Sequence, residues 1–478
     1  MNTAAEYTEQ YADKMTATEV RASVGLASIF GLRMLGMFLI LPVFALYAEH
    51  LPGGGNHTMV GLALGAYGLT QAMLQLPFGM ASDKFGRKRV IYFGLLLFAI
   101  GSFVAASATT IETIILGRVI QGAGAISAAV TALLADSTRE EHRTHAMAMI
   151  GGTIGVTFAA SLVIGPALYQ YIGMDGIFTM TGILSLTAIA VVKWYIPDPL
   201  ASHFHSDAEA SPAKLGDVLR NTQLLRLNFG IFALHAAQMA MFVVIPFALR
   251  STGNLDINHH WEVYLPVVMI AFVVMIPAII YGEKRAKLKQ VFVSAVGLML
   301  MAQLGMAASM HHFWGIVAAL TAYFVAFNIL EATLPSLISK IAPVGAKGTA
   351  MGVYNTSQSL GLFLGGVSGG WLSQHYGFSA VFMFSASLMS IWLIAALGMR
   401  SPPAVKTRMF RLGIMAADQA ALLNTRLRSI QGVYESAVVA EEGIALLKVA
   451  QQGWDEVAAT KLIEESKHGI SQLSNFDR

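Results

Sequence analysis

Residues 79–90 of the chain read Gly79-Met80-Ala81-Ser82-Asp83-Lys84-Phe85-Gly86-Arg87-Lys88-Arg89-Val90. This stretch places one carboxylate and four cationic side chains in a short link between two long apolar runs. Short loops rich in lysine and arginine between membrane-spanning helices lie on the cytoplasmic side of the membrane. The glycines allow a tight turn, and Asp83 is able to accept amide hydrogens at the start of a neighbouring helix. The stretch therefore predicts two membrane spans joined in the cytoplasm; a positive loop with an incidental aspartate is the plainer interpretation.

The composition agrees with a membrane protein. The chain is 55% hydrophobic and 12% charged, with a mean hydropathy of +0.60, which a water-soluble fold of this length does not need. The net charge of +3 is too small to suggest a nucleic-acid partner. Cysteine is absent, which excludes disulfides, thiol metal sites and a catalytic cysteine. The segment before Thr18 lacks the basic start and apolar core of a signal peptide. We expect neither a cofactor nor a metal.

Twelve apolar runs are long enough to cross a bilayer, six on each side of a polar stretch. The predicted fold is an all-α membrane protein with two six-helix bundles, 22–196 and 222–399. A cytoplasmic segment 1–21 precedes them, a cytoplasmic linker 197–221 joins them, and a linker with a small domain, 400–478, follows. The predicted spans are 22–48, 58–82, 90–108, 113–135, 144–171, 175–196, 222–249, 262–282, 290–309, 312–340, 347–375 and 377–399.

The distribution of lysine and arginine predicts the orientation. Alternate links are basic, at 84–89, 139–143 and 284–289, whereas the opposite links contain Arg250 and no other lysine or arginine. Both termini are therefore expected in the cytoplasm. The first basic link also reappears in weaker form at 283–289, which indicates a parallel repeat of two halves. Convergence of two basic loops is the alternative.

The end of the chain differs from the spans. Residues 404–478 hold no spanning run, but 409–414, 433–439 and 444–449 are typical of short strands. Helical patterns occupy 416–430 and 454–465. This β-α-β-β-α order predicts a small ferredoxin-like module without the cysteine pair that many such modules use for metal.

Several motifs resemble signatures of the Major Facilitator Superfamily of transporters. Residues 79–89 resemble its loop 2–3 signature, and 118–122 its R-x-x-Q-G signature, often linked to proton coupling. Gly155 and Gly165-Pro166 resemble the signature of its 12-span drug:proton antiporters, although Ala167-Leu168 replace a frequent glycine pair. The resemblance covers nearly the whole chain and implies a bacterial inner-membrane, proton-driven exporter. It also implies a charge relay of Asp83, Arg87 and Asp136 beside span eleven. This relay belongs to a conformational switch, whose residues are Gly79, Asp83, Lys84, Gly86, Arg87, Lys88 and Asp136.

Small residues recur in the second and eleventh predicted spans, for example at Gly61, Gly65 and Gly365. Such spacing lets helix backbones approach closely. In the superfamily these two spans meet between the halves, where close but reversible packing suits a rocking motion. Tight packing without motion is the alternative.

Few ionisable groups lie deep in the predicted spans. A charge in hydrocarbon is costly, so such groups are expected to face a functional cavity. A buried structural ion pair is the alternative. For His235, a simple hydrogen bond to a neighbouring carbonyl is an equally good interpretation. We predict that Arg33 and Glu331 pair across the cavity when its cytoplasmic side is closed, and that Asp83 then receives amides from span eleven. His145 is a further titratable group. The predicted cavity or proton-coupling residues are Arg33, Arg118, Gln121, Gly122, His235, Asn328 and Glu331.

Together these features predict a proton-coupled transporter, working as a monomer, that exports a small amphiphilic compound. Its partners would be that compound, protons, the bilayer and a regulatory ligand or protein at the C-terminal domain. Uptake of a sugar-like solute is an alternative, and a transporter-like sensor that signals through the C-terminal domain is another. No nucleotide-binding loop or metal-ligand spacing occurs, so no enzyme is expected.

Overall fold

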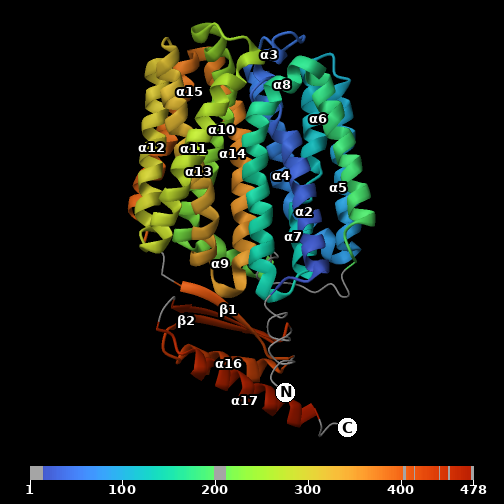
Figure 1. Cartoon of the computed structure of the whole chain (residues 1–478), viewed down its shortest axis with the longest axis vertical. Helices are drawn as coiled ribbons and strands as arrows, with labels where there is room; N and C mark the ends of the chain where they lie inside the picture. The colour runs from blue at the N-terminus through green and yellow to red at the C-terminus, as the bar shows by residue number, and fades with distance from the viewer. Residues whose placement is uncertain are drawn as a thin grey trace.

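The computed structural model describes residues 14–198, 212–401, 405–413, 415–440, 442–450 and 453–474. Most of the predicted segment 1–21 and of the linker 197–221 therefore lies outside the described residues. Figure 1 shows a bundle of upright helices with a small sheet and two helices beyond one end of it. We call this end of the bundle the domain end and the opposite end the far end.

The first half of the bundle follows the predicted spans with two breaks. Leu39–Val43 separates α2 from α3, because Pro42 has no N–H and its ring clashes with a carbonyl one turn earlier. Gly124 to Ile126 separates α6 from α7, so the predicted continuous spans 22–48 and 113–135 are each interrupted. The helices are α2 (Ala17–Phe38), α3 (Phe44–Ala48), α4 (His57–Phe85), α5 (Arg87–Ala106), α6 (Ile111–Ala123), α7 (Ser127–Asp136) and α8 (Glu140–Trp194).

The second half has fewer interruptions. A short helix, α9 (Leu215–Arg220), precedes it within the predicted linker. The long helices carry prolines, as at Pro246 and Pro335, which the partner helices of a membrane bundle tolerate. They are α10 (Thr222–Gly253), α11 (Trp261–Lys284), α12 (Leu288–Ser309), α13 (Phe313–Ile341), α14 (Lys347–Tyr376) and α15 (Phe378–Leu397).

Within the described residues, ten helical stretches are long and apolar enough to cross a membrane. One of them, His145–Trp194, covers nearly all of the two predicted spans 144–171 and 175–196, which meet at Gly173 with a φ of 65°. The helix α14 is not among the ten. It is 30 residues long but rich in glycine and serine. Its length is therefore sufficient to cross a membrane, whereas its mean hydropathy is low for a membrane-spanning helix.

The two halves meet most closely along α4 and α14. A β-carbon at Gly61 would lie 2.0 Å from the carbonyl oxygen of Gly366, and one at Gly68 would lie 2.5 Å from that of Ser359. Nearer the domain end, a β-carbon at Gly79 would meet only Ala128 of the same half. At the far end, Arg250 binds Glu49 at 2.7 Å and His57 stacks on Phe247 at 5.1 Å. The halves are thus closed against each other at the far end.

Gly61→Ala is expected to lower the melting temperature of the purified protein. Its methyl group cannot fit against the Gly366 backbone, and overpacking of this kind costs about 1–3 kcal/mol. The control is Gly151→Ala, because a β-carbon at Gly151 meets no atom within 4 Å and alanine favours a helix by about 1 kcal/mol. Equal melting temperatures for the two variants would contradict the close approach of α4 and α14.

The C-terminal elements have the predicted β-α-β-β-α order. They are β1 (Val405–Arg411), α16 (Ala417–Arg428), β2 (Val433–Val439), β3 (Ile444–Ala450) and α17 (Glu456–Ser474). The sheet is antiparallel with strand order β1-β3-β2. The first strand begins before the predicted 409–414, because its partner β3 pairs with it from Val405 onward, and backbone pairing outweighs the polar residues there.

Candidate functional site

The predicted charge relay is assembled at the domain end of the first half. Gly86 ends α4 with a φ of 96°, a conformation that glycine adopts without strain. The sharp turn brings Arg87, at the start of α5, back against α4. Its guanidinium binds the carboxylate of Asp83 and, at 3.2 Å, that of Asp136 at the end of α7. Arg87 and Asp136 are buried, whereas the side chain of Asp83 is 43% exposed.

The other residues of the predicted switch have different surroundings. Lys88 donates to the carbonyl of Ile196 at 2.7 Å and binds Asp198 at 2.7 Å, so it ties α5 to the end of α8. Lys84 is exposed. Gly79 faces Ala128 of α7. The motif therefore links α4, α5, α7 and α8 at one end of the first half.

The weaker repeat in the second half forms a comparable link. Glu283, at the end of α11, binds Lys340 near the end of α13 at 3.0 Å. In the first half, Asp83 occupies the corresponding end of α4, and Arg87 connects it to Asp136 at the end of α7. This correspondence supports an internal repeat rather than two unrelated basic loops.

Arg87→Ala is expected to destabilise the protein by about 3–5 kcal/mol, because the variant leaves the buried carboxylate of Asp136 without this charged partner. Arg89→Ala is the control, since Arg89 is exposed in the same turn and surface changes are usually within about 0.5 kcal/mol. Chemical unfolding in detergent measures both. Matching stabilities would show that the relay contributes no ion pairing.

Two buried cations occupy the interior of the first half. Arg118, 0% exposed, donates to Gln121 at 2.8 Å, and Gln121 donates to Ser102 at 2.7 Å. Arg33 donates to Ser127 at 2.9 Å. The ring of Tyr67 lies between the two arginines, 4.9 Å from Arg118 and 5.6 Å from Arg33. Nε and one Nη of each arginine have no hydrogen-bond partner among the described residues.

The predicted glycine motifs place backbones close together at two of three positions. A β-carbon at Gly122 would lie 2.2 Å from the carbonyl oxygen of Tyr67, and one at Gly165 would lie 2.6 Å from that of Leu39. Gly165 and Pro166 thus stand where α8 crosses the end of α2. A β-carbon at Gly155 meets nothing within 4 Å, so packing does not require glycine there.

The second half contributes one carboxylate far from any helix end. Glu331 of α13 has 31% of its side chain exposed and lies 3.8 Å from Nε2 of His235 in α10. His235 is buried and contacts the carbonyl of Ile231 at 3.2 Å and Gln358 at 2.7 Å. These contacts fit Nδ1 as the donor and Nε2 as the acceptor. A proton on Nε2 would instead allow an ion pair with Glu331.

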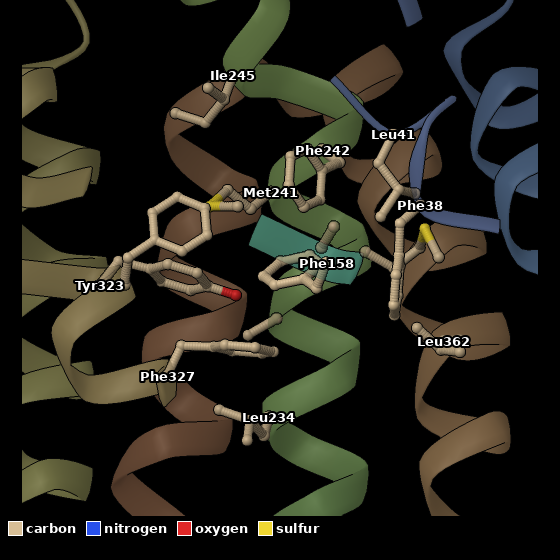
Figure 2. Packing of buried hydrophobic residues seen from close by; sticks show 14 of the residues in the cluster. Phe38, Leu41, Phe158, Leu234, Met241, Phe242, Ile245, Tyr323, Phe327 and Leu362 are labelled. Atoms are coloured by element: carbon tan, nitrogen blue, oxygen red, sulfur yellow. The ribbon is translucent and has the colours of Figure 1, made fainter. Parts of the chain in front are cut away.

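An aromatic cluster adjoins this carboxylate on its far-end side. Phe158 of the first half lies 5.0 Å from Phe38 and 5.4 Å from Phe327 of α13. Phe327, one turn before Glu331, also contacts the ring of His235 at 5.9 Å. Figure 2 shows Phe158 between Phe38 on one side and Tyr323 and Phe327 on the other. The cluster closes the space between the halves on the far-end side of Glu331.

The structure does not bring every predicted pair together. Arg33 contacts Ser127 and Glu331 contacts His235, and no ion pair joins Arg33 to Glu331 among the described residues. The carboxylate of Asp83 accepts from Arg87 rather than from the start of α14. Both contacts stay predictions for another conformation. Asn328 is half-buried on α13, and His145 is exposed rather than inside the bundle.

Gln358, Tyr67 and Ser127 are among the residues of these clusters that were not predicted. Gln358 and Tyr67 each lie in a helix of mostly small and apolar residues, so a search for isolated polar groups in the spans would find them. Ser127 gives no such signal, because serine commonly binds the carbonyl of its own helix. Only the fold brings it to Arg33.

The fold and these clusters define a membrane transporter. The profile of the Major Facilitator Superfamily matches residues 26–366 and 280–426, and the chain belongs to this superfamily. It is therefore a transporter and not an enzyme, as the motifs predicted. The superfamily's transporters carry small molecules across a membrane, so a small-molecule substrate follows from membership.

Individual relatives are consistent with this assignment. Over 437 residues the chain is 44% identical to the inner membrane transport protein YajR of Escherichia coli strain K12, covering 91% of this chain and 95% of that protein. It is 26% identical over 352 residues to the multidrug resistance protein MdtH of Aeromonas hydrophila, covering 72% and 85%. The structure of a bacterial homolog of the human lysosomal transporter Spinster has the same fold, with a TM-score of 0.64, 14% identity and coverage of 80% and 97%.

Proposed function

We propose that the protein is a proton-coupled exporter of small amphiphilic compounds that works by alternating access. The observation that carries this proposal is the carboxylate of Glu331. It lies inside the bundle beside His235, and 31% of its side chain is exposed. Protonation removes its charge, so occupancy by a proton changes its interaction with the neighbouring histidine. Such intramembrane acids mark proton pathways in transporters.

The surroundings of Glu331 support an amphiphilic cargo. Phe158, Phe327 and Tyr323 form a buried aromatic cluster on the far-end side of the carboxylate, and apolar pockets with a few polar groups bind such compounds. Two relatives are named as multidrug resistance proteins, and export is the direction of transport that we propose for this chain. Arg33 and Arg118 are proposed as the cationic counterpart in the first half.

The proposed arrangement in the membrane follows from helix lengths and loop charges. The stretches α2, α4, α5, α6–α7, both parts of α8, α10, α11, α12, α13, α14 and α15 would make twelve crossings of a bacterial inner membrane. The basic link at 84–89 puts the domain end, and with it both termini, in the cytoplasm. The bundles would be 22–196 and 222–399, and the sheet order β1-β3-β2 with its helices supports a ferredoxin-like domain within 400–478.

Flux in proteoliposomes tests the function. Vesicles with entrapped ethidium or carboxyfluorescein, representing a cationic and an anionic amphiphile, receive an imposed pH gradient. The proposal expects dye movement coupled to proton movement in the opposite direction, detected with a pH dye. Dye and protons moving together would favour solute uptake. No proton-linked flux across a broader set of amphiphiles would contradict the transport proposal and favour a sensor.

A further inference from the structure

The strand β3 is buried on both faces although helices cover only one face of its sheet. Ala445, Leu447 and Val449 belong to the core of the C-terminal domain with α16 and α17. Because strand residues alternate between faces, Ile444, Leu446 and Lys448 point the other way. Ile444 and Leu446 pack there against Val344, which is 1% exposed. The partner of this second face is therefore the turn between α13 and α14, residues 342–347.

Two charges of the domain complement the two helix ends at this turn. The ammonium group of Lys448 donates to the carbonyl of Ala342, which caps α13, and cations favour the C-terminal end of a helix. The carboxylate of Glu435 accepts the backbone N–H of Val344 at 3.1 Å. Glu435 and Lys448 also pair with each other at 3.3 Å. Burial lowers the pKa of Lys448, and Glu435 opposes that shift.

The same turn receives further contacts from outside the bundle. Lys347, the first residue of α14, donates to Thr407 of β1 at 2.8 Å. Lys214, before α9 in the segment between the two halves, donates to the carbonyl of Gly345. A cavity of about 290 Å³ adjoins the Lys448–Glu435 pair, lined also by Gln223, Lys340 and Arg400. Charged and incompletely filled contacts between domains are typical of reversible ones.

The turn leads directly into α14, the helix that packs on α4 through glycines at the far end. A rocking motion of the two halves requires the start of α14 to change its position relative to α4. The domain binds both sides of the turn, Ala342 at the end of α13 and Lys347 at the start of α14, so a movement of α14 relative to α13 has to break one of these contacts.

We propose that the C-terminal domain is a clamp on the α13–α14 turn, and that its docking slows the movement of α14. This inference rests on the proposed transport function for its consequence, whereas the docking contact itself does not. Locking the clamp should slow transport, and opening it should speed transport.

A disulfide provides the locking experiment. A β-carbon at Gly345 would lie 3.8 Å from that of Ala437 in β2, which is about the usual Cβ–Cβ separation across a disulfide. The chain has no cysteine, so Gly345→Cys/Ala437→Cys introduces the only thiols. In the full-length protein we expect the oxidised pair to transport at least fivefold more slowly than wild type, with recovery on reduction. Each single variant is a control that should be insensitive to oxidant. Unchanged flux in fully crosslinked protein would overturn the clamp.

The opening experiment uses Glu435→Lys, which replaces the acceptor of the Val344 N–H with a cation facing Lys448. Glu465→Lys is the matched control, because this substitution makes the same change of charge at an exposed position of α17. Glu435→Lys should raise flux at least twofold and Glu465→Lys should leave it unchanged. A lowered flux, or equal flux in both variants, would overturn the clamp.

Amide hydrogen exchange separates this inference from the function on which it rests. Glu435→Lys should increase exchange in the first turns of α14, and Glu465→Lys should not, with no substrate required. If wild type carries no dye in either direction but this difference in exchange is seen, the transport proposal fails and the docking contact stands. If wild type transports and exchange in α14 is the same in both variants, the clamp fails and the transport proposal stands.

Discussion

Glu331→Gln is expected to reduce proton-driven flux at least 100-fold while leaving the protein folded. Glutamine has nearly the shape of glutamate and is able to bond with His235, but it cannot take up or release a proton. The variant should still exchange substrate across vesicles without a pH gradient, because exchange needs rocking of the halves and not a proton cycle. Parallel measurements of gradient-driven flux and of exchange, with a pH dye inside the vesicles, distinguish the two activities.

Glu283→Gln is the matched control for Glu331→Gln. Glu283 undergoes the same chemical change, but its side chain is 40% exposed and paired with Lys340 at the domain end. It should keep proton-driven flux within about twofold of wild type, since exposed ion pairs contribute only about 0–1 kcal/mol. Retained proton coupling in Glu331→Gln would exclude Glu331 as the proton site. Loss of both exchange and gradient-driven flux would show instead that the glutamate serves substrate binding or folding.

Much of the fold could be predicted from the sequence, because a bilayer requires long apolar helices. The boundaries failed where a local residue overrides hydropathy, as at Pro42 and Gly124. The docking face of β3 is visible in the composition of the strand, because Ile444–Ala450 carries almost no polar face, which an exposed sheet would need. Its partner, Val344, is far away in the sequence and follows only from the structure.

The candidate site could be predicted residue by residue but not contact by contact. Arg33, Arg118 and Glu331 stand out as charges in apolar runs, since each is costly there. Their partners do not stand out, because Ser127, Gln358 and Tyr67 have many other structural uses. The Arg33–Glu331 pair was predicted from two opposite charges inside the spans, one in each half. Each of the two instead contacts a residue of its own half.

Arg118→Met is expected to abolish proton-driven flux without lowering the melting temperature. Arg118 is fully buried and its contacts are Gln121 and the face of Tyr67 rather than a carboxylate. Replacing buried charges with apolar side chains of similar size is often stabilising, by about 1–4 kcal/mol. The variant also leaves Gln121 without its donor, which costs about 1–3 kcal/mol. The two effects roughly cancel, so the fold should survive the loss of the guanidinium.

Activity and stability therefore respond differently if Arg118 serves transport, and they respond together if it is a structural anchor. Gradient-driven flux and melting temperature are measured on the same preparations of wild type, Arg118→Met and Arg118→Lys. A 100-fold loss of flux at an unchanged melting temperature would support a role in transport. Arg118→Lys keeps the charge but lacks the planar fork that reaches Gln121 and stacks on Tyr67, so partial flux is expected. A melting temperature that falls by several degrees in Arg118→Met, with flux reduced only in proportion to the folded protein, would assign Arg118 to the packing of α6 against α4.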